Sequence, residues 1–190
     1  MKHALIVIDM QQGSFGPDSP RHDAAGLVAR LNDLASAVRD SGGAVVFIQH
    51  DGPPGDAHEP GRPGWRLLPD LDVRRDDAVI HKRSCDSFLD TGLAAHLHKA
   101  GIDGVIVTGC ATDYCVDTTV RSALARGLST TVPSDGHTTA DRPHLPAVKI
   151  IEHHNAIWAD FLAPRGPAHV LPTDSVIHQI AALRPPHRRA

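Results

Sequence analysis

The stretch that decides the fold is Val105-Ile106-Val107-Thr108-Gly109-Cys110-Ala111-Thr112-Asp113-Tyr114-Cys115-Val116. Its β-branched apolar start is typical of a buried strand, and the amphipathic pattern from 116 to 127 predicts a helix. We expect this junction to place Cys115 near a helix N-terminus, where free N–H groups and the helix dipole favour negative charge. The stretch therefore predicts a lowered pKa for the Cys115 thiol, and a cysteine nucleophile at the C-terminal edge of a sheet.

Apolar segments alternate with amphipathic ones along the whole chain. Strands are predicted over residues 4–8, 44–49, 78–81, 105–108, 129–133 and 168–171. Helices are predicted over 23–41, 91–100, 115–126 and 143–161, with a last one ending at 183. Strands that alternate with helices indicate right-handed crossovers and a parallel sheet. We therefore expect one three-layer α/β/α, Rossmann-like domain over 1–183, followed by a disordered tail at 184–190.

The composition excludes several classes of function. The chain has 190 residues, and 19 Lys and Arg against 22 Asp and Glu give a net charge of −3. No basic stripe or nucleic-acid-reading motif is present, and no apolar run approaches the roughly 18 residues of a membrane span. The first residues lack the features of a signal peptide. We therefore expect a cytoplasmic protein with a small-molecule substrate as its partner, not a nucleic acid or a membrane.

The cysteines and histidines do not form a metal motif. Three cysteines, with no Cys-x-x-Cys pair, argue against a disulfide framework or a zinc finger. In a cytosolic protein these thiols are expected to be reduced. The 14 histidines are scattered, without a His-Glu-x-x-His spacing. The expectation is an enzyme without metal or cofactor.

Three chemically distinct side chains follow three of the predicted strands. Asp9 follows the first strand, Lys82 the third, and the Cys115 junction the fourth. In parallel α/β sheets, ligands bind beyond the carboxyl ends of the strands. We therefore expect Asp9, Lys82 and Cys115 to meet at one rim of the sheet.

Several motifs together resemble one known superfamily. The segments ALIVIDMQQ (4–12), HKR (81–83) and GCATDYCV (109–116) resemble the three signatures of the isochorismatase-like cysteine hydrolases, which include nicotinamidases and N-carbamoylsarcosine amidohydrolase. SDGHTT (134–139) and IIEHHN (150–155) also resemble it, so the likeness covers about 3–162. It implies a six-stranded parallel sheet, a homo-oligomer, a non-prolyl cis bond at Cys110–Ala111, and catalytic roles for Asp9, Lys82 and Cys115.

Two departures from the superfamily narrow the expected chemistry. True isochorismatases cleave a vinyl ether and lack the nucleophilic cysteine, so Cys115 favours acyl transfer at an amide or related carbon. Metal-containing nicotinamidases resemble one another in an Asp-x-His pair with a further histidine. Here residues 49–54 read Gln-His-Asp-Gly-Pro-Pro, which disfavours such a metal site at His50 and Asp51.

A hypothesis for the reaction follows. Cys115 attacks the substrate carbonyl carbon and forms a thioester, which water hydrolyses. Asp9 acts as general base toward the thiol and then as general acid toward the leaving amine, while Lys82 holds both electrostatically. The backbone N–H groups of Ala111 and Cys115 are the candidate oxyanion donors. Cys110 is interpreted as a structural residue that shapes this backbone.

Other residues are candidates for the pocket wall. The loops at 10–20, 51–69 and 136–146 are expected to set specificity, and the Pro/Gly-rich loop at 51–69 is long enough to be functional. Cys85 is interpreted as a core or loop residue, with a pocket role left open. The predicted substrate contacts, of which Trp65 is favoured, are Phe15, Gln49, Trp65, Tyr114 and His137.

Three functions compete at this stage. The favoured one is a cysteine amidohydrolase for a small carbon–nitrogen substrate, and iodoacetamide should then find one hyper-reactive thiol at Cys115. A catalytically silent binding or scaffold protein would show three slow, equal thiols. A redox protein would form a reversible Cys110–Cys115 disulfide, although these residues lack the Cys-x-x-Cys spacing.

Overall fold

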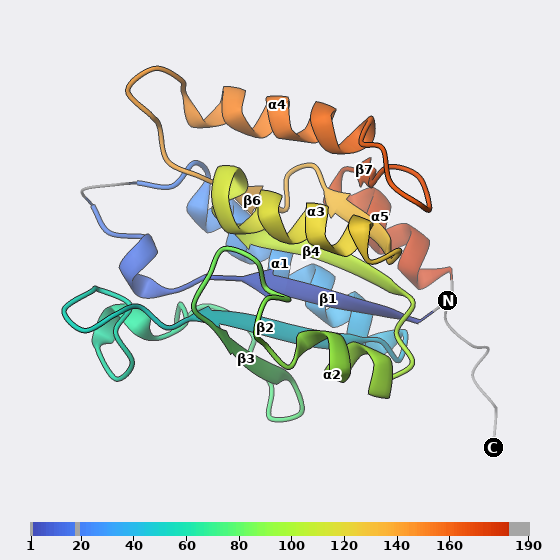
Figure 1. Ribbon diagram of the computed structural model, residues 1–190, viewed down its shortest axis with the longest axis horizontal. Coiled ribbons are helices and arrows are strands. Elements are labelled where there is room, and N and C mark those ends of the chain that lie inside the picture. The colour runs from blue at the N-terminus through green and yellow to red at the C-terminus, as the bar shows by residue number, and fades with distance from the viewer. Residues whose placement is uncertain (1, 18–19, 183–190) are drawn as a thin grey trace.

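A parallel β-sheet forms the centre of the fold. The computed structural model describes residues 2–17 and 20–182 (Figure 1). Within them the strands are β1 (His3–Ile8), β2 (Ala44–His50), β3 (Ala78–Lys82), β4 (Gly104–Cys110), β5 (Ser129–Pro133), β6 (His137–Thr138) and β7 (His169–Leu171). All pairings are parallel, in the order β3-β2-β1-β4-β5-β7. The parallel α/β fold is confirmed. The expected six strands become seven because β6 pairs with the end of β4.

Helices cover both faces of the sheet (Figure 1). They are α1 (Ala24–Asp40), α2 (Leu93–Lys99), α3 (Asp117–Ala125), α4 (Ala147–Ala159) and α5 (Thr173–Ala181). Side chains of α1 and α5 share one core, and those of α2, α3 and α4 contribute to the other. The five predicted helices are all present, although the one expected at 115 begins earlier, as a π-helical turn, η3 (Thr112–Val116). The predicted helix end at 183 and the tail at 184–190 lie outside the described residues.

The central strand β1 explains why both faces must be covered. Its side chains alternate between the two sides of the sheet, as the geometry of a strand requires. Ala4, Ile6 and Ile8 pack in the core with α2 and α3, whereas Leu5 and Val7 pack in the core with α1. A strand that is apolar at every position is typical of a parallel sheet buried on both sides.

The strand order reverses between β1 and β4. From β1 the chain builds β2 and β3 on one side, and from β4 it builds β5 and β7 on the other. Gly109 stands opposite Ile8 with φ +113°, and any side chain there would collide with the Ile8 backbone. Glycine therefore permits the close approach of the two strands. Because ligands bind at such a reversal, this topology points to the rim beside Asp9 and Cys110.

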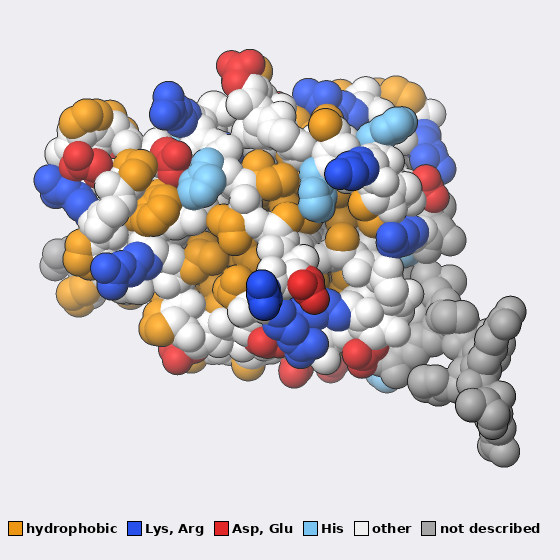
Figure 2. Space-filling view, turned by 90° about the horizontal axis from the view of Figure 1, so that it is seen from below, with side chains coloured by type: hydrophobic (Ala, Val, Ile, Leu, Met, Phe, Trp, Pro, Cys, Tyr) orange, Lys and Arg blue, Asp and Glu red, His pale blue; other side chains and the backbone are white. Residues whose placement is uncertain are grey.

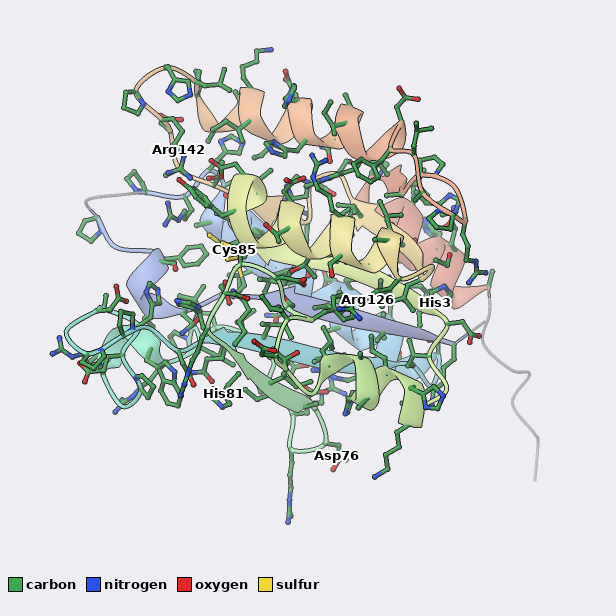
Figure 3. All side chains as sticks on the ribbon, in the orientation of Figure 1. His3, Asp76, His81, Cys85, Arg126 and Arg142 are labelled. Atoms are coloured by element: carbon green, nitrogen blue, oxygen red, sulfur yellow. The ribbon has the colours of Figure 1, made fainter. Side chains whose placement is uncertain are left out.

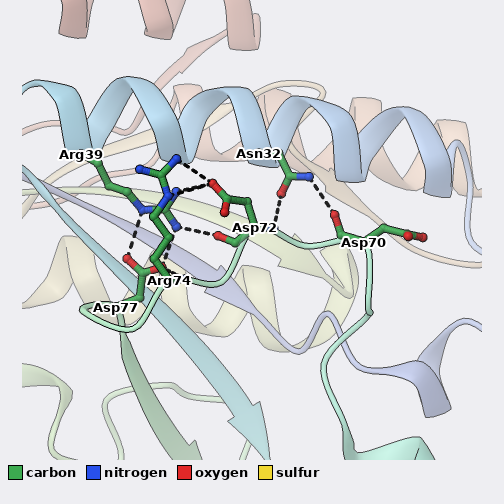
Figure 4. A network of polar contacts seen from close by, with 6 residues as sticks. All are labelled: Asn32, Arg39, Asp70, Asp72, Arg74 and Asp77. Atoms are coloured by element: carbon green, nitrogen blue, oxygen red, sulfur yellow. Dashed lines mark hydrogen bonds and ion pairs between the residues drawn. The ribbon is translucent and has the colours of Figure 1, made fainter.

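A polar network fixes the segment that enters β3 (Figure 4). Arg39 on α1 contacts Asp77 Oδ2 at 2.6 Å and Asp72 Oδ2 at 2.9 Å. Asn32, about two turns earlier on the same face of α1, donates to the Asp70 carbonyl and accepts from the Asp72 N–H. The network anchors the chain directly before the strand that ends at Lys82.

The surface shows no concentration of one charge on the face seen from the β3 side. Figure 2 shows basic, acidic and histidine side chains interspersed around hydrophobic ones on this face. This distribution agrees with the nearly balanced net charge of −3. In the described part of the chain, each helix is too short or too polar to span a bilayer.

Candidate active site

Asp9 occupies an unusual backbone conformation at the end of β1. Its φ is +48°, in the left-handed region that few residues other than glycine adopt, although aspartate is among those that do. Its N–H still donates to the Ile48 carbonyl at 3.0 Å, so the residue stays attached to β2 while the chain turns out of the sheet. Asp9 is only 6% exposed. The end of β1 therefore presents a buried carboxylate to the rim.

Lys82 brings the three predicted residues together. Its Nζ lies 2.7 Å from Asp9 Oδ2 and 3.2 Å from Cys115 Sγ. A third bond of 2.8 Å runs from Nζ to the Ser84 carbonyl oxygen. An ammonium group has three donors, so each is engaged. Lys82 is 2% exposed, and its position across β2 from Asp9 makes it the electrostatic centre of the site.

The charges of this cluster can be assigned from its surroundings. Burial works against the charged form of Lys82, but the contacts with Asp9 and Cys115 together outweigh burial, and the pKa of Lys82 is raised. Lys82 is therefore an ammonium that forms a buried ion pair with Asp9.

Cys115 does not have the lowered pKa that its position in the sequence predicts. Burial raises the pKa of the Cys115 thiol, the Asp9 carboxylate raises it further, and Lys82 only partly opposes them. The expectation is wrong for two reasons: Cys115 lies inside the η3 turn rather than at the start of α3, and it faces a carboxylate as well as a lysine. In the resting site the sulfur keeps its proton.

Asp9 has the capacity to take that proton. Oδ2 is paired with Lys82, whereas Oδ1 is buried and has no hydrogen-bond partner within residues 2–17 and 20–182. A buried oxygen without a partner costs free energy, so its presence calls for an explanation. Asp9 therefore has a free carboxylate oxygen in the same cavity that Cys115 lines.

The backbone between Cys110 and Cys115 is tightly folded. The Cys110–Ala111 peptide bond is cis, as the resemblance implies. The Ala111 carbonyl accepts hydrogen bonds from Tyr114 N and Val116 N. Cys110 is buried, and burial raises the pKa of its thiol to about 12, which suits the structural role expected for it. Cys85 is an exposed free thiol.

A cavity of about 680 Å³ opens beside this cluster. Its volume suits a small organic molecule. The labelled Cys85, His81 and Arg142 all lie toward the end of the molecule where the strands end (Figure 3). The lining residues are Asp9, Gln11, Ser14, Arg21, His50, Asp56, His58, Arg83, Ser84, Cys85, Cys110, Ala111, Tyr114 and Cys115.

Of the five predicted substrate contacts, only Tyr114 lines the cavity. Phe15 packs against the core beside α1. Gln49 is buried and donates to the Trp65 carbonyl at 2.7 Å. Trp65 stacks on His81 at 5.6 Å and donates Nε1–H to Asp51. Gln49 and Trp65 are thus not among the residues that line this cavity, and their contact with substrate stays a prediction.

His137 is a core residue rather than a ligand contact. Its Nδ1 pairs with Thr112 Oγ1 at 2.9 Å and its Nε2 with Asn155 Oδ1 at 3.0 Å. Trp158 packs edge-on against the ring. Burial lowers the pKa of His137 to about 4, so the ring is neutral. Through its bond to Thr112, His137 fixes the first residue of η3.

Several residues that line the cavity were not predicted from the sequence. Ser14, Asp56 and His58 lie in the loops predicted to set specificity, but nothing in the pattern singles them out. Arg83 belongs to the quoted HKR triplet. Gln11 accepts from His50 N–H and donates to the carbonyls of His50 and Trp65.

The loop at 136–146 is clamped to the cysteine motif. Asp113 accepts hydrogen bonds from Arg142 and from Thr139 Oγ1 at 2.6 Å. Burial works to raise the pKa of Asp113, but these bonds outweigh it and the pKa is lowered. The Arg142 guanidinium also lies 5.0 Å from the centre of the Tyr114 ring. The clamp holds Tyr114, the aromatic residue of the cavity wall.

Metal-ligating side chains do not converge here. Within residues 2–17 and 20–182, no group of three or more His, Cys, Asp or Glu is arranged to hold a metal ion. Asp51, one of the two residues considered from the sequence, accepts a hydrogen bond from Trp65 and is paired with His81. Burial opposes these bonds, yet the pKa of Asp51 remains lowered.

Comparison with known proteins identifies the class. Residues 3–160 match the isochorismatase domain, and the chain belongs to that family. A streptothricin hydrolase of Streptomyces noursei is 35% identical over 145 residues, covering 76% of this chain. A maleamate amidohydrolase of Pseudomonas putida is 29% identical over 149 residues, covering 69% of this chain and 70% of that protein. The chain spans only 52% and 58% of two streptothricin hydrolases that it matches.

Solved structures give the same fold. An isochorismatase from Pseudomonas putida KT2440 superposes with a TM-score of 0.82 at 29% identity, covering 91% of this chain and 89% of that one. N-carbamoylsarcosine amidase from Thermoplasma acidophilum superposes with a TM-score of 0.72 at 23% identity, covering 92% and 98%. The second likeness concerns the fold alone.

Proposed function

We propose that this protein is a cysteine amidohydrolase that cleaves an amide or ureide-type C–N bond in a small molecule. The observation that carries the proposal is the position of Lys82 Nζ, 2.7 Å from Asp9 Oδ2 and 3.2 Å from Cys115 Sγ beside a cavity. Relatives named as streptothricin hydrolase and maleamate amidohydrolase support hydrolysis at a C–N bond.

The first half of the reaction forms a thioester. As Sγ of Cys115 attacks the carbonyl carbon, its proton passes to Asp9, whose Oδ1 is unpaired. Lys82 stays protonated and stabilises the sulfur as its charge develops. The backbone N–H groups of Ala111 and Cys115 donate hydrogen bonds to the oxyanion. The amine then leaves with the proton from Asp9.

The second half hydrolyses the thioester. Asp9, again ionised, takes a proton from a water molecule that attacks the carbonyl carbon; the C–S bond then breaks, and the Cys115 thiolate that leaves takes this proton back from Asp9. The raised pKa of Cys115 fits this scheme, because a sulfur that holds its proton at rest requires a base within reach. Lys82 has no basic role while it is protonated.

The test combines turnover with trapping of the intermediate. A panel of streptothricin, maleamate, ureidoacrylate and N-carbamoylsarcosine is assayed for hydrolysis, with the full chain. Cys115→Ala should lower turnover by about 10⁴-fold or more. Cys85→Ala removes an exposed thiol at the same cavity and should retain activity. Acid quenching followed by mass spectrometry should find the acyl group on Cys115.

Two results would contradict the proposal. One is full turnover by folded Cys115→Ala protein. The other is binding of panel molecules without any hydrolysis, which would favour the catalytically silent alternative.

A further inference from the structure

Three polar side chains across the cavity form a second hydrogen-bonded chain. Ser14 Oγ lies 3.0 Å from His58 Nε2, and His58 Nδ1 lies 3.1 Å from Asp56 Oδ1. All three residues line the same cavity as Cys115, yet the proposed thioester chemistry uses none of them. A hydroxyl paired with a histidine that a carboxylate orients is the general signature of an activated nucleophile.

The proton positions follow from Asp56. Asp56 accepts both the backbone N–H of His58 at 2.7 Å and the ring nitrogen Nδ1. The backbone bond is the main reason that the pKa of Asp56 is lowered. Because an ionised carboxylate only accepts, Nδ1 carries a proton, which leaves Nε2 as the ring nitrogen that can accept one. The Ser14 hydroxyl therefore donates to Nε2, as a nucleophile does to its base.

Glycine allows the loops to approach closely enough for this contact. A β-carbon on Gly13 would lie 3.1 Å from His58 Nε2 and 3.1 Å from the Gly64 carbonyl oxygen. Both distances are tighter than ordinary van der Waals contact. The absence of a side chain next to Ser14 is what admits the His58 ring to the serine hydroxyl.

We infer that Ser14, His58 and Asp56 form a second acyl-transfer site that hydrolyses small activated esters. Ser14 Oγ attacks the ester carbonyl carbon while its proton moves to His58 Nε2. The C–O bond breaks, and the alcohol leaves with that proton. Water then attacks the acyl-serine, giving one proton to His58, which returns it to Ser14 Oγ. Arg83 lines the same cavity and is a cationic side chain there.

The experiment uses the full chain carrying Cys115→Ala, so that the proposed thioester chemistry is absent. A fluorophosphonate probe should modify Ser14, located by peptide mass spectrometry. Hydrolysis of p-nitrophenyl acetate should persist, and fall by about 100-fold when Ser14→Ala or His58→Gln is added. Thermal melting checks that each variant is folded.

Three results would overturn the inference. They are a folded Cys115→Ala protein that takes no probe, a label on Ser84, and ester hydrolysis that survives both Ser14→Ala and His58→Gln. Ser84 is the matched comparison because it lines the same cavity but donates its hydroxyl to the Asp86 carbonyl. Wild-type protein with its thiols blocked by iodoacetamide repeats the labelling without any substitution. Failure here leaves amide turnover by Cys115 unaffected, so the two proposals fail separately.

Discussion

Lys82 and Asp9 form a buried ion pair, with Nζ and Oδ2 2.7 Å apart and side chains 0% and 9% exposed. Residues this deeply buried cannot exchange their partner for water. The pair joins β3 to the end of β1 across β2, and its two charges act with burial on the pKa of Cys115, Asp9 raising it and Lys82 lowering it. The chemistry and the stability of the site therefore depend on the same contact.

Asp9→Asn should separate thiol reactivity from turnover. Removing the carboxylate eliminates a charge that raises the pKa of Cys115, while Lys82 continues to lower it. Alkylation of Cys115 by iodoacetamide at pH 7 should therefore become faster, and turnover should fall by about 10²- to 10⁴-fold because the base is lost. Alkylation quenched at timed intervals, followed by peptide mapping, measures the rate at Cys115, and the exposed Cys85 is the internal reference. Slower alkylation of the variant would contradict the charge assignment.

Lys82→Met should destabilise the fold as well as abolish turnover. It leaves the Asp9 carboxylate buried without a counter-ion, at a cost of about 3–5 kcal/mol in the free energy of unfolding. Lys149→Met is the control, because its ion pair with Glu152 is exposed and is worth about 1 kcal/mol or less. Urea denaturation measures both.

The double variant Lys82→Met with Asp9→Asn tests whether the unpaired Asp9 carboxylate causes this loss of stability. It removes both charges and should regain part of the stability that Lys82→Met loses. No recovery would mean that the loss comes from packing rather than from an unpaired charge.

The lowered pKa of His137 predicts that the free energy of unfolding declines in mild acid. The folded pKa of about 4 lies below the ordinary value of 6.5, so the unfolded chain binds a proton that the folded chain resists. The contribution is complete above pH 6.5 and is lost as the pH falls toward 4, by about 3 kcal/mol. His137→Gln should flatten the pH dependence of unfolding over this interval. His153→Gln, at an exposed position on α4, should leave the curve unchanged.

Arg39 should contribute more to stability than its neighbour Arg74. The side chain of Arg39 is 12% exposed and that of Asp77 is 5% exposed, so Arg39→Ala leaves Asp77 with a buried charge, at a cost of about 3 kcal/mol. Replacing Arg74 by alanine should destabilise the protein less, because its side chain is half exposed and solvent screens its ion pair with Asp72. Thermal or urea unfolding compares the two, and equal losses would refute the distinction.

The sequence predicts the parallel sheet and the meeting of Asp9, Lys82 and Cys115, because these follow from strand periodicity and from residues at strand ends. The protonation of Cys115 could not be predicted, since it depends on how deeply the thiol is buried and how near the Asp9 carboxylate lies. The contact between Ser14 and His58 joins two irregular loops, and no periodicity encodes it. Likewise, the bonds of Gln49 and His137 show that a polar residue near a strand end can serve the backbone or core instead of the cavity.

The left-handed conformation of Asp9 has an evolutionary consequence. At φ +48°, aspartate, asparagine and glycine are accommodated, whereas most other side chains would cost about 1–2 kcal/mol of backbone energy. Replacement by asparagine or glycine would leave the backbone at the end of β1 unstrained, but it would remove the base and leave the Lys82 ammonium buried without its counter-ion. A lineage that loses the chemistry of this fold at Asp9 is therefore expected to replace Lys82 as well, and so to keep the architecture in a protein that only binds.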